Sequence, residues 1–330
     1  MNNLGIIVLN WNGHQDTVEA ISSIRNNEEQ YFTIFLLDNG SKDYSIEYIV
    51  NWLKKSYGLS YKIMNENEFL HCKDFSNYTL YFIKGKHNLG FAKGNNFVWN
   101  KIKNIFTYIF LLNNDTIITK NAISNMINYM NKNKNTGAIS CDIRYYSQPD
   151  KLWNAGGYFS WYGDRKYYKQ RVIDNFKKNR IEAIKTPFVT GCALMVRSEI
   201  VKAYGVFTEK FFFGEEDFNY CKRLSQNGIV VESLLSSKIY HKVGNSIKKT
   251  QKNVNSYILH FSNRIIDLKE FYNPLKWKLW RTLYIIAAFF KLVVITKEIK
   301  TPLMVVRYIC HYTSKLDSVS YDTFLEINSL

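Results

Sequence analysis

The first 141 residues alternate short, continuous apolar runs with longer amphipathic segments. A continuous run rich in Ile, Leu and Phe is typical of a strand buried on both faces of a sheet. The pattern predicts five such strands, at 4–9, 33–38, 79–84, 108–113 and 137–141. It predicts helices near 14–26, 45–57, 93–104 and 120–133. Strands alternating with helices at this spacing indicate an α/β fold with a mainly parallel sheet flanked by helices.

The alternation is lost after residue 141. Residues 144–171 are aromatic and basic, which favours a region that covers a substrate. Beyond them, we expect a strand at 187–197, a short helix from Ser198, a helix within 214–228 ending at Gly228, and a strand at 229–235.

Polar clusters follow three of the predicted strands, in "LNWNG" (9–13), "LLDNGSKD" (36–43) and "NNDT" (113–116). In such sheets, ligands bind at the carboxyl ends of strands. A turn or a helix cap would explain any one cluster, and Ser41 and Asp43 fit that alternative. Three clusters at one edge favour a ligand site.

Neither GxxxxGK[ST] nor GxGxxG is present, so both nucleotide fingerprints are missing. A nucleotide can still bind through a carboxylate on its base or ribose and a metal that bridges its diphosphate to an Asp. Asp38 fits the first task and Asp115 the second. The stretch "HNLGFAKGNN" (87–96) adds a glycine-containing loop at a helix start, which suits an anion or is only a capped turn.

Three adjacent acids, Glu215 to Asp217, follow an aromatic run. Acids at a helix start often only complement the helix dipole. A partly dry pocket would instead raise the pKa of one carboxyl and suit it to be a general base. His241 is a candidate metal ligand only if the fold brings it to Asp115.

The 330 residues carry a net charge of +16, which predicts an anionic partner. From Lys242 to Lys315 there are 14 basic and 3 acidic residues, a net of +11, so most of the excess lies there. The five cysteines are odd in number and widely spaced, and they form no CxxC motif, which indicates reduced thiols in a cytosolic setting. We expect no signal peptide and no transmembrane helix, because the longest apolar stretch, 283–295, falls short of the roughly 20 residues of a span.

Residues 273–300 combine tryptophans and basic side chains around an apolar centre. Their charges do not gather on one helix face, yet basic flanks and interfacial aromatics suit a helix lying on a membrane surface. The alternative is a core helix or one that packs in a homodimer.

Eight motifs in order resemble the family 2 glycosyltransferases, and among them the rhamnosyltransferase-like bacterial enzymes of surface-polysaccharide synthesis. They are "VLNWN", "LLDNGSKD", "HNLGFAKGNN", "FLLNNDT", "WNAGG", "FVTGCALMVR", "FFFGEEDFNYCKRL" and "YHKVGNS". The resemblance covers residues 4–247, with "FSNRIIDLKEFYN" (261–273) as a weaker continuation. It implies a GT-A catalytic domain over 1–247, with a nucleotide-sugar half (1–141) and an acceptor half (142–247). Residues 248–330 would be a helical extension.

The resemblance also implies roles for individual residues. Asp38 matches the acid that contacts the nucleobase. Asp115 matches the last acid of the DxD motif, which holds Mg²⁺ or Mn²⁺ on the diphosphate, and His241 matches the histidine that reaches back to it. Asp217 matches the catalytic base, beside Glu216. The remaining donor-binding positions are Asn10, Asn12, Asn88, Gly90, Asn95, Asn114, Trp153 and Gly156.

Three positions depart from the family pattern. Asn113 replaces the first DxD acid, Asn219 replaces an acid often found two residues after the base, and Glu215 is an extra acid. The first departure removes one anionic ligand from the expected metal site. The last two leave the choice of base open between Glu216 and Asp217.

The expected reaction is inverting, metal-dependent transfer of a sugar to a lipid-linked glycan, by a cytoplasmic enzyme peripheral to the inner face of the plasma membrane. The resemblance favours dTDP-rhamnose as donor, with UDP-hexoses or a galactofuranose donor as alternatives. Two rivals stand beside this expectation. A nucleic-acid-binding protein would suit the basic charge, but no nucleic-acid motif is present, so we expect no such partner. A catalytically dead scaffold would suit Asn113.

Overall fold

The computed structural model describes residues 4–56, 60–160, 163–243 and 254–330. Its N-terminal part is a parallel sheet in the order β3-β4-β2-β1-β5. The strands are β1 (Leu4–Asn10), β2 (Thr33–Asp38), β3 (Tyr61–Asn65), β4 (Leu80–Lys84) and β5 (Tyr108–Asn113). Four of them confirm the predicted strands. The edge strand β3 was not predicted, because its residues, of which only Met64 is buried, form no continuous apolar run.

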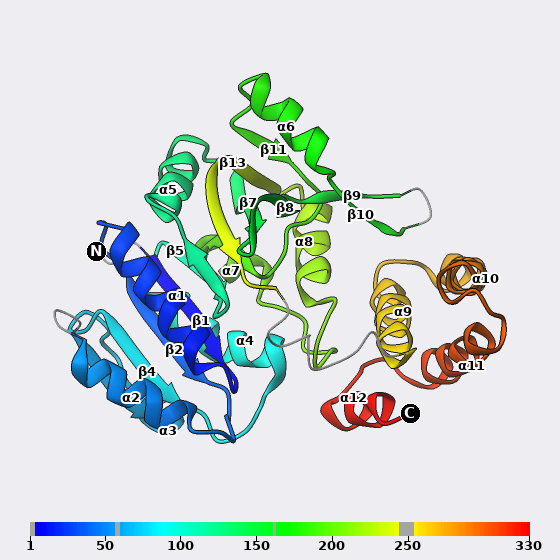
Figure 1. The fold of residues 1–330 in the computed structure, drawn as a ribbon, viewed down its shortest axis with the longest axis horizontal. Coiled ribbons are helices and arrows are strands. Elements are labelled where there is room, and N and C mark those ends of the chain that lie inside the picture. The colour runs from blue at the N-terminus through cyan, green and yellow to red at the C-terminus, as the bar shows by residue number, and fades with distance from the viewer. Residues whose placement is uncertain (1–3, 57–59, 161–162, 244–253) are drawn as a thin grey trace.

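Helices cover both faces of this sheet (Figure 1). On one face lie α1 (His14–Asn27), α2 (Ser45–Lys55) and α5 (Ala122–Lys132). On the other lie α3 (Glu66–His71), α4 (Gly90–Ile102), α7 (Ser198–Tyr204) and α8 (Glu216–Gln226). Both faces of the sheet are apolar, as strand β1 illustrates. Successive strand residues point to opposite faces, so Ile6 and Val8 pack in the core on one face and Ile7 in the core on the other. The expected α/β layering is confirmed.

Beyond β5, the sheet continues as a mixed one. Strand β12 (Ala193–Arg197) lies between β5 and β7 (Thr136–Tyr145), antiparallel to both, and β13 (Val230–His241) runs parallel to β7. The predicted strand at 187–197 is therefore wrong in its first six residues, which form a loop. The expected division between residues 141 and 142 falls inside β7.

Shorter elements complete this part of the fold. Strands β6 (Thr116–Ile118) and β11 (Ala183–Lys185) pair with β13, and β8 (Gln148–Asn154) pairs with β7. A separate hairpin of β9 (Gly157–Phe159) and β10 (Arg165–Tyr167) precedes α6 (Gln170–Lys178). The stretch 144–171 that was expected to cover a substrate contains the end of β7, β8 and the hairpin, and its residues 161–162 lie outside the described residues.

Four C-terminal helices gather in a bundle beside the sheet, coloured gold to red in Figure 1. They are α9 (Val254–Lys269), α10 (Pro274–Thr296), α11 (Lys300–Lys315) and α12 (Tyr321–Asn328). Their own core includes Ile258, Phe261, Ile265, Leu292 and Ile309. The expected domain boundary between residues 247 and 248 lies outside the described residues.

Helix α10 is longer than its uninterrupted apolar run suggested. Its 23 residues are long and apolar enough to cross a membrane, by length and composition, so the expectation that no segment reaches this length is corrected. The core helix of a soluble protein can pass the same test, but it would be mostly buried. Only 22% of the most apolar window of α10 is buried.

Candidate active site

Strands β1, β2 and β5 end at one edge of the sheet. Asn10 pairs with Asp38, and Leu9 with Asn113, so the three polar clusters lie side by side. This edge is where the topology of a parallel sheet places a ligand.

Asp38 is fully buried beneath this edge. One carboxylate oxygen accepts from Asn10 Nδ2 and Ser41 Oγ, both at 2.7 Å, and the other accepts from the Ser41 N–H at 2.9 Å. Three protein donors therefore already engage Asp38, which fixes the loop after β2. Ser41, which the sequence suggested only as a helix cap, is the link between Asp38 and β1.

Asn12 lies on the solvent side of the same cluster. Its own N–H donates to Ser41 Oγ at 2.9 Å and its side-chain oxygen accepts from the Lys42 N–H at 2.9 Å. Its φ of 51° is left-handed, a conformation that Asn tolerates better than most residues. The neighbouring Trp11 is 53% exposed, which leaves a flat apolar surface at the mouth of the cluster. Sequence reasoning did not single out Trp11.

Asn114 joins the end of β5 to helix α1. Its Nδ2 donates to Thr17 Oγ1 at 2.9 Å, and Thr17 Oγ1 donates to Asn10 Oδ1 at 2.7 Å. The first and third strand ends are thus connected by a chain of hydrogen bonds.

The loop before α4 folds back onto the end of β2. Asn88 Oδ1 accepts from the Gly90 N–H at 2.8 Å and from Asn39 Nδ2 at 3.1 Å. Gly90 has a φ of +80°, and a Cβ there would stand 2.5 Å from the Phe212 carbonyl oxygen, so only glycine fits. Asn95 is different: it is buried and donates to the Phe91 carbonyl within α4. The structure brings Asn88 and Gly90 to the edge but leaves Asn95 inside the helix packing.

The structure brings His241 to Asp115, as the sequence reading required. His241 Nε2 lies 3.0 Å from Asp115 Oδ1, because β13 pairs with β6 directly after the Asp115 turn. The Trp153 ring stands edge-on to the imidazole, with centroids 4.3 Å apart. Gly156 follows three residues after Trp153, has a φ of +82° and lies against Thr186. Asp115, His241 and Trp153 form one compact cluster.

The described residues contain no group of three or more His, Cys, Asp or Glu side chains that could hold a metal alone. Mg²⁺ is often held by one or two carboxylates together with substrate phosphates. An Asp and a His fit an ion that arrives with a diphosphate. Within the described residues His241 Nδ1 is buried without a hydrogen-bond partner, whereas Nε2 faces Asp115, so Nε2 is the nitrogen placed to bind an ion together with that carboxylate.

One loop connects this edge to the acidic helix start. The Gly191 N–H donates to Asp217 Oδ2 at 2.9 Å, and the carbonyl of the next residue, Cys192, accepts from the Asn113 N–H at 2.9 Å. Asp217 at the start of α8 is therefore held beside the end of β5. Sequence reasoning placed residues 190–192 in a strand and missed this role.

The two candidate bases differ in their surroundings. Burial raises the pKa of Glu216 to about 8, helped by the charge of Asp217, and in the described part of the chain Glu216 Oε2 has no hydrogen-bond partner. Burial raises the pKa of Asp217 to about 6, while N–H bonds from Gly191 and Phe218 favour its charged form. As the pH rises, these surroundings favour ionisation of Asp217 ahead of Glu216. A general base must be ionised to take a proton, so the surroundings favour Asp217 for that role.

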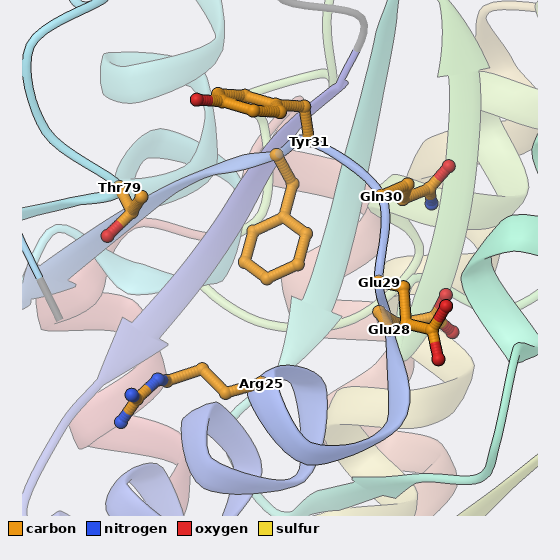
Figure 2. Close-up of a pocket in the computed structure, with 7 residues that line it drawn as sticks. Arg25, Glu28, Glu29, Gln30, Tyr31 and Thr79 are labelled. Carbon is orange, nitrogen blue, oxygen red and sulfur yellow. The ribbon is translucent and has the colours of Figure 1, made fainter. Parts of the chain in front are cut away.

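A shallow cavity of about 250 Å³ lies away from this edge (Figure 2). It is lined by Arg25 at the end of α1, by residues between α1 and β2, and by Thr79 before β4, at the amino ends of the strands. Its Glu28 caps α5, since the carboxylate accepts from the Ile123 and Ser124 N–H groups. The cavity contains no residue of the polar clusters, so we place the functional site at the carboxyl edge.

Comparisons with known proteins identify a family segment and a fold for this chain. Residues 70–205 match the family model described as Glycosyl transferase family 2. No curated protein matches the chain. A crystal structure of GalNAc-T7 with UDP, GalNAc and Mn²⁺ has a TM-score of 0.61 and 12% identity, over 82% of this chain and 48% of that one. S. aureus TarS 1–349 in complex with UDP-GlcNAc has a TM-score of 0.53 and 11% identity, over 86% and 71%. The GT-A fold is confirmed, and the chain spans about half the length of the GalNAc-T7 structure.

Proposed function

We propose that this chain is a glycosyltransferase that moves one sugar from a nucleotide-diphosphate donor to an acceptor hydroxyl with inversion. Its family segment and its fold support the proposal. One observation carries the proposal. The 190–192 loop hydrogen-bonds both Asp217 and the end of β5, next to Asp115. In this proposal, the base and the diphosphate site lie on either side of one short loop.

In the proposed reaction, the acceptor oxygen attacks the anomeric carbon of the donor and Asp217 takes the hydroxyl proton. The bond from that carbon to the diphosphate oxygen breaks, and the nucleoside diphosphate leaves. A single displacement inverts the anomeric centre and needs no enzyme nucleophile. Asp115 and His241 would hold Mg²⁺ or Mn²⁺, which offsets the charge that develops on the leaving diphosphate.

For the donor, we propose that the nucleobase binds at the ends of β1 and β2. Asn10, Asn12 and Asp38 form the polar floor, and the exposed Trp11 ring can stack on a base. The motif resemblance favours dTDP-rhamnose. A UDP-sugar is the second candidate, because the two structures of similar fold were solved with UDP or UDP-GlcNAc.

For the acceptor, we propose a lipid-linked glycan of a surface polysaccharide, reached from the cytoplasmic face of the membrane. Helix α10 supports this setting because the side chains of one face are both apolar and exposed. They recur every three or four residues, at Leu275, Leu279, Leu283, Ile286, Phe290 and Val294. The opposite face packs into the helical bundle through Tyr284, Ala288 and Leu292.

The test is a panel of dTDP-rhamnose, UDP-GlcNAc, UDP-GalNAc and UDP-glucose, with and without EDTA. Nucleoside diphosphate release is measured in membranes that supply lipid-linked acceptors, beside the Asp217→Asn variant. We expect release with one donor, its loss with EDTA and its recovery with Mn²⁺. Release that is unchanged in Asp217→Asn would reject the base assignment, and release undiminished by EDTA would reject the metal role.

A further inference from the structure

Helix α8 carries Asp217, and one of its faces is covered by α9 from the C-terminal bundle. Glu215, Asn219 and Lys222 follow one another at intervals of four and three residues, so they share that face. Asn219 Nδ2 donates to Asp267 Oδ1 at 2.7 Å, and Lys222 Nζ lies 4.3 Å from the centre of the Phe271 ring. The contact explains why position 219 is an amide: an acid there would face the buried Asp267 carboxylate.

Glu215 is the central contact of this face. Its side chain is buried between two guanidinium groups, with Oε1 2.7 Å from Arg165 Nη2 on β10 and Oε2 3.3 Å from Arg264 Nη1 on α9. The Arg264 side chain is itself 2% exposed and also donates to the Gly163 carbonyl. Arg165 stacks on the Phe218 ring, 3.9 Å from its centre. The hairpin, α8 and α9 are therefore tied together at one carboxylate.

Glu215 also has an unfavourable backbone. Its φ of 75° is left-handed, which costs a non-glycine residue of order 1 kcal/mol or more. Such a conformation persists only where the surroundings hold it. Since Glu216 and Asp217 follow directly, the conformation of Glu215 sets the direction in which the first turn of α8 leaves the loop.

We propose that Arg165 and Arg264 are positioning residues for the base: by holding Glu215 from two sides they fix the first turn of α8, so helix α9 completes the active site. The inference rests on the proposed function for its catalytic meaning. Its structural meaning, that α9 holds the start of α8, stands apart from the identity of the substrate.

The pH dependence gives the inference a specific signature. The charge of Arg165 lowers the pKa of Asp217 against the effect of burial. Removing that charge should move the acid limb of the kcat profile to higher pH, because less of the base is then ionised at a given pH. The other titratable groups that face Asp217 are Tyr167, Cys192, Glu215, Glu216 and Cys221.

The experiment uses the full chain with Arg165→Met, Arg264→Met and Arg264→Lys. Arg281→Met is the matched control, because Arg281 bonds only Thr313 and the Cys310 carbonyl among its described hydrogen bonds, within the bundle. With the donor found active, we expect kcat to fall about 100-fold in both Met variants at unchanged donor KM, as for a misplaced catalytic group. Arg264→Lys should recover part of kcat, and Arg165→Met should shift the acid limb upward.

Hydrogen exchange supplies a second readout that needs no activity. Amides of residues 215–219 should exchange faster in Arg264→Met than in Arg281→Met, while those of β1 and β2 stay protected. Equal protection of residues 215–219 in the two variants would overturn the inference, even if the wild type transfers no sugar. Wild-type kcat in both Met variants would overturn it too. An inactive wild type with the expected exchange would count against the proposed function alone.

Discussion

Asp217 and Glu216 are adjacent carboxyl groups whose pKa values differ because their partners differ. Asp217 receives two backbone N–H bonds, and Glu216 Oε2 receives none among the described residues. The sequence could not choose between them, since both stand in one acidic run. The choice depends on Gly191, whose N–H reaches Asp217 from a loop 26 positions away in the chain.

Replacing Asp217 with Asn should lower kcat by roughly 10²- to 10⁴-fold, the usual contribution of a general base. Donor KM should change little, because Asp217 is expected to act on the acceptor proton. In the wild type, kcat should rise with pH through about 6 as the carboxyl ionises. Initial rates measured between about pH 5 and 8 test this. Glu216→Gln is the control, and its kcat should show the same rise with pH. A wild-type profile that is flat across this range would contradict it.

Glu216 should affect how stability depends on pH rather than how kcat depends on pH. Its pKa is raised from 4.5 to about 8 in the fold. The unfolded chain therefore releases this proton at lower pH than the folded chain, so stability is lost as pH rises from 4.5 towards about 8. Glu216→Gln removes this group, and its melting temperature should gain on the wild type as pH increases across that window. A constant difference in melting temperature at every pH would show that Glu216 has an ordinary pKa.

Among elements, the continuous apolar strands were the predictable part. Strands β1, β2, β4 and β5 are buried along nearly their whole length, so each appears in the sequence as a continuous apolar run. Segment 187–192 was predicted as a strand because of its apolar residues, but it forms a loop. The backbone of this loop hydrogen-bonds Asp217 and Asn113. Arg165 and Arg264 left no local signal, since their meeting at Glu215 joins segments about 50 residues apart. The extra acid Glu215 was the one available hint.

The start of α4 should be sensitive to the smallest side chain. Gly90→Ala would place a Cβ 2.5 Å from the Phe212 carbonyl oxygen at a φ of +80°. Gly228→Ala is the matched control, since its φ is +73° and nothing lies within 4 Å. The control should lose about 1 kcal/mol from backbone strain alone, and Gly90→Ala should lose clearly more. Urea unfolding of both variants measures the difference in their free energies of unfolding. Equal losses would mean that the loop before α4 shifts to accommodate the added Cβ.

On the scale of the whole molecule, the charge and apolar surface of the C-terminal bundle point the same way. The exposed side of α10 is apolar, and the segment 242–315 holds most of the net positive charge. A contiguous apolar surface of this kind is ordinarily covered by lipid or by another protein. On α10 this surface faces outward, and Lys276, Lys278 and Lys291 are exposed on the same helix.

Full-length protein should float with vesicles that contain phosphatidylglycerol and less with neutral phosphatidylcholine, and added salt should weaken the binding. The double variant Leu279→Glu with Leu283→Glu should lose at least about tenfold in vesicle affinity, since each leucine contributes roughly 1.5 to 3 kcal/mol when buried. Leu70→Glu on α3 is the control, because Leu70 is similarly exposed far along the chain from α10. Undiminished flotation of the double variant, with a change from dimer to monomer, would assign this face to a homodimer.

The contact between α8 and α9 bears on how a soluble form of this enzyme should be made. Cutting the chain before residue 254 would remove the apolar surface together with Arg264 and Asp267. Glu215 would then keep Arg165 but lose Arg264, and Asn219 would lose its hydrogen bond to Asp267. Redesigning the outer face of α10 would keep them. A shortened enzyme that proves soluble but inactive would then report the loss of a support for its catalytic helix, and not the absence of its acceptor.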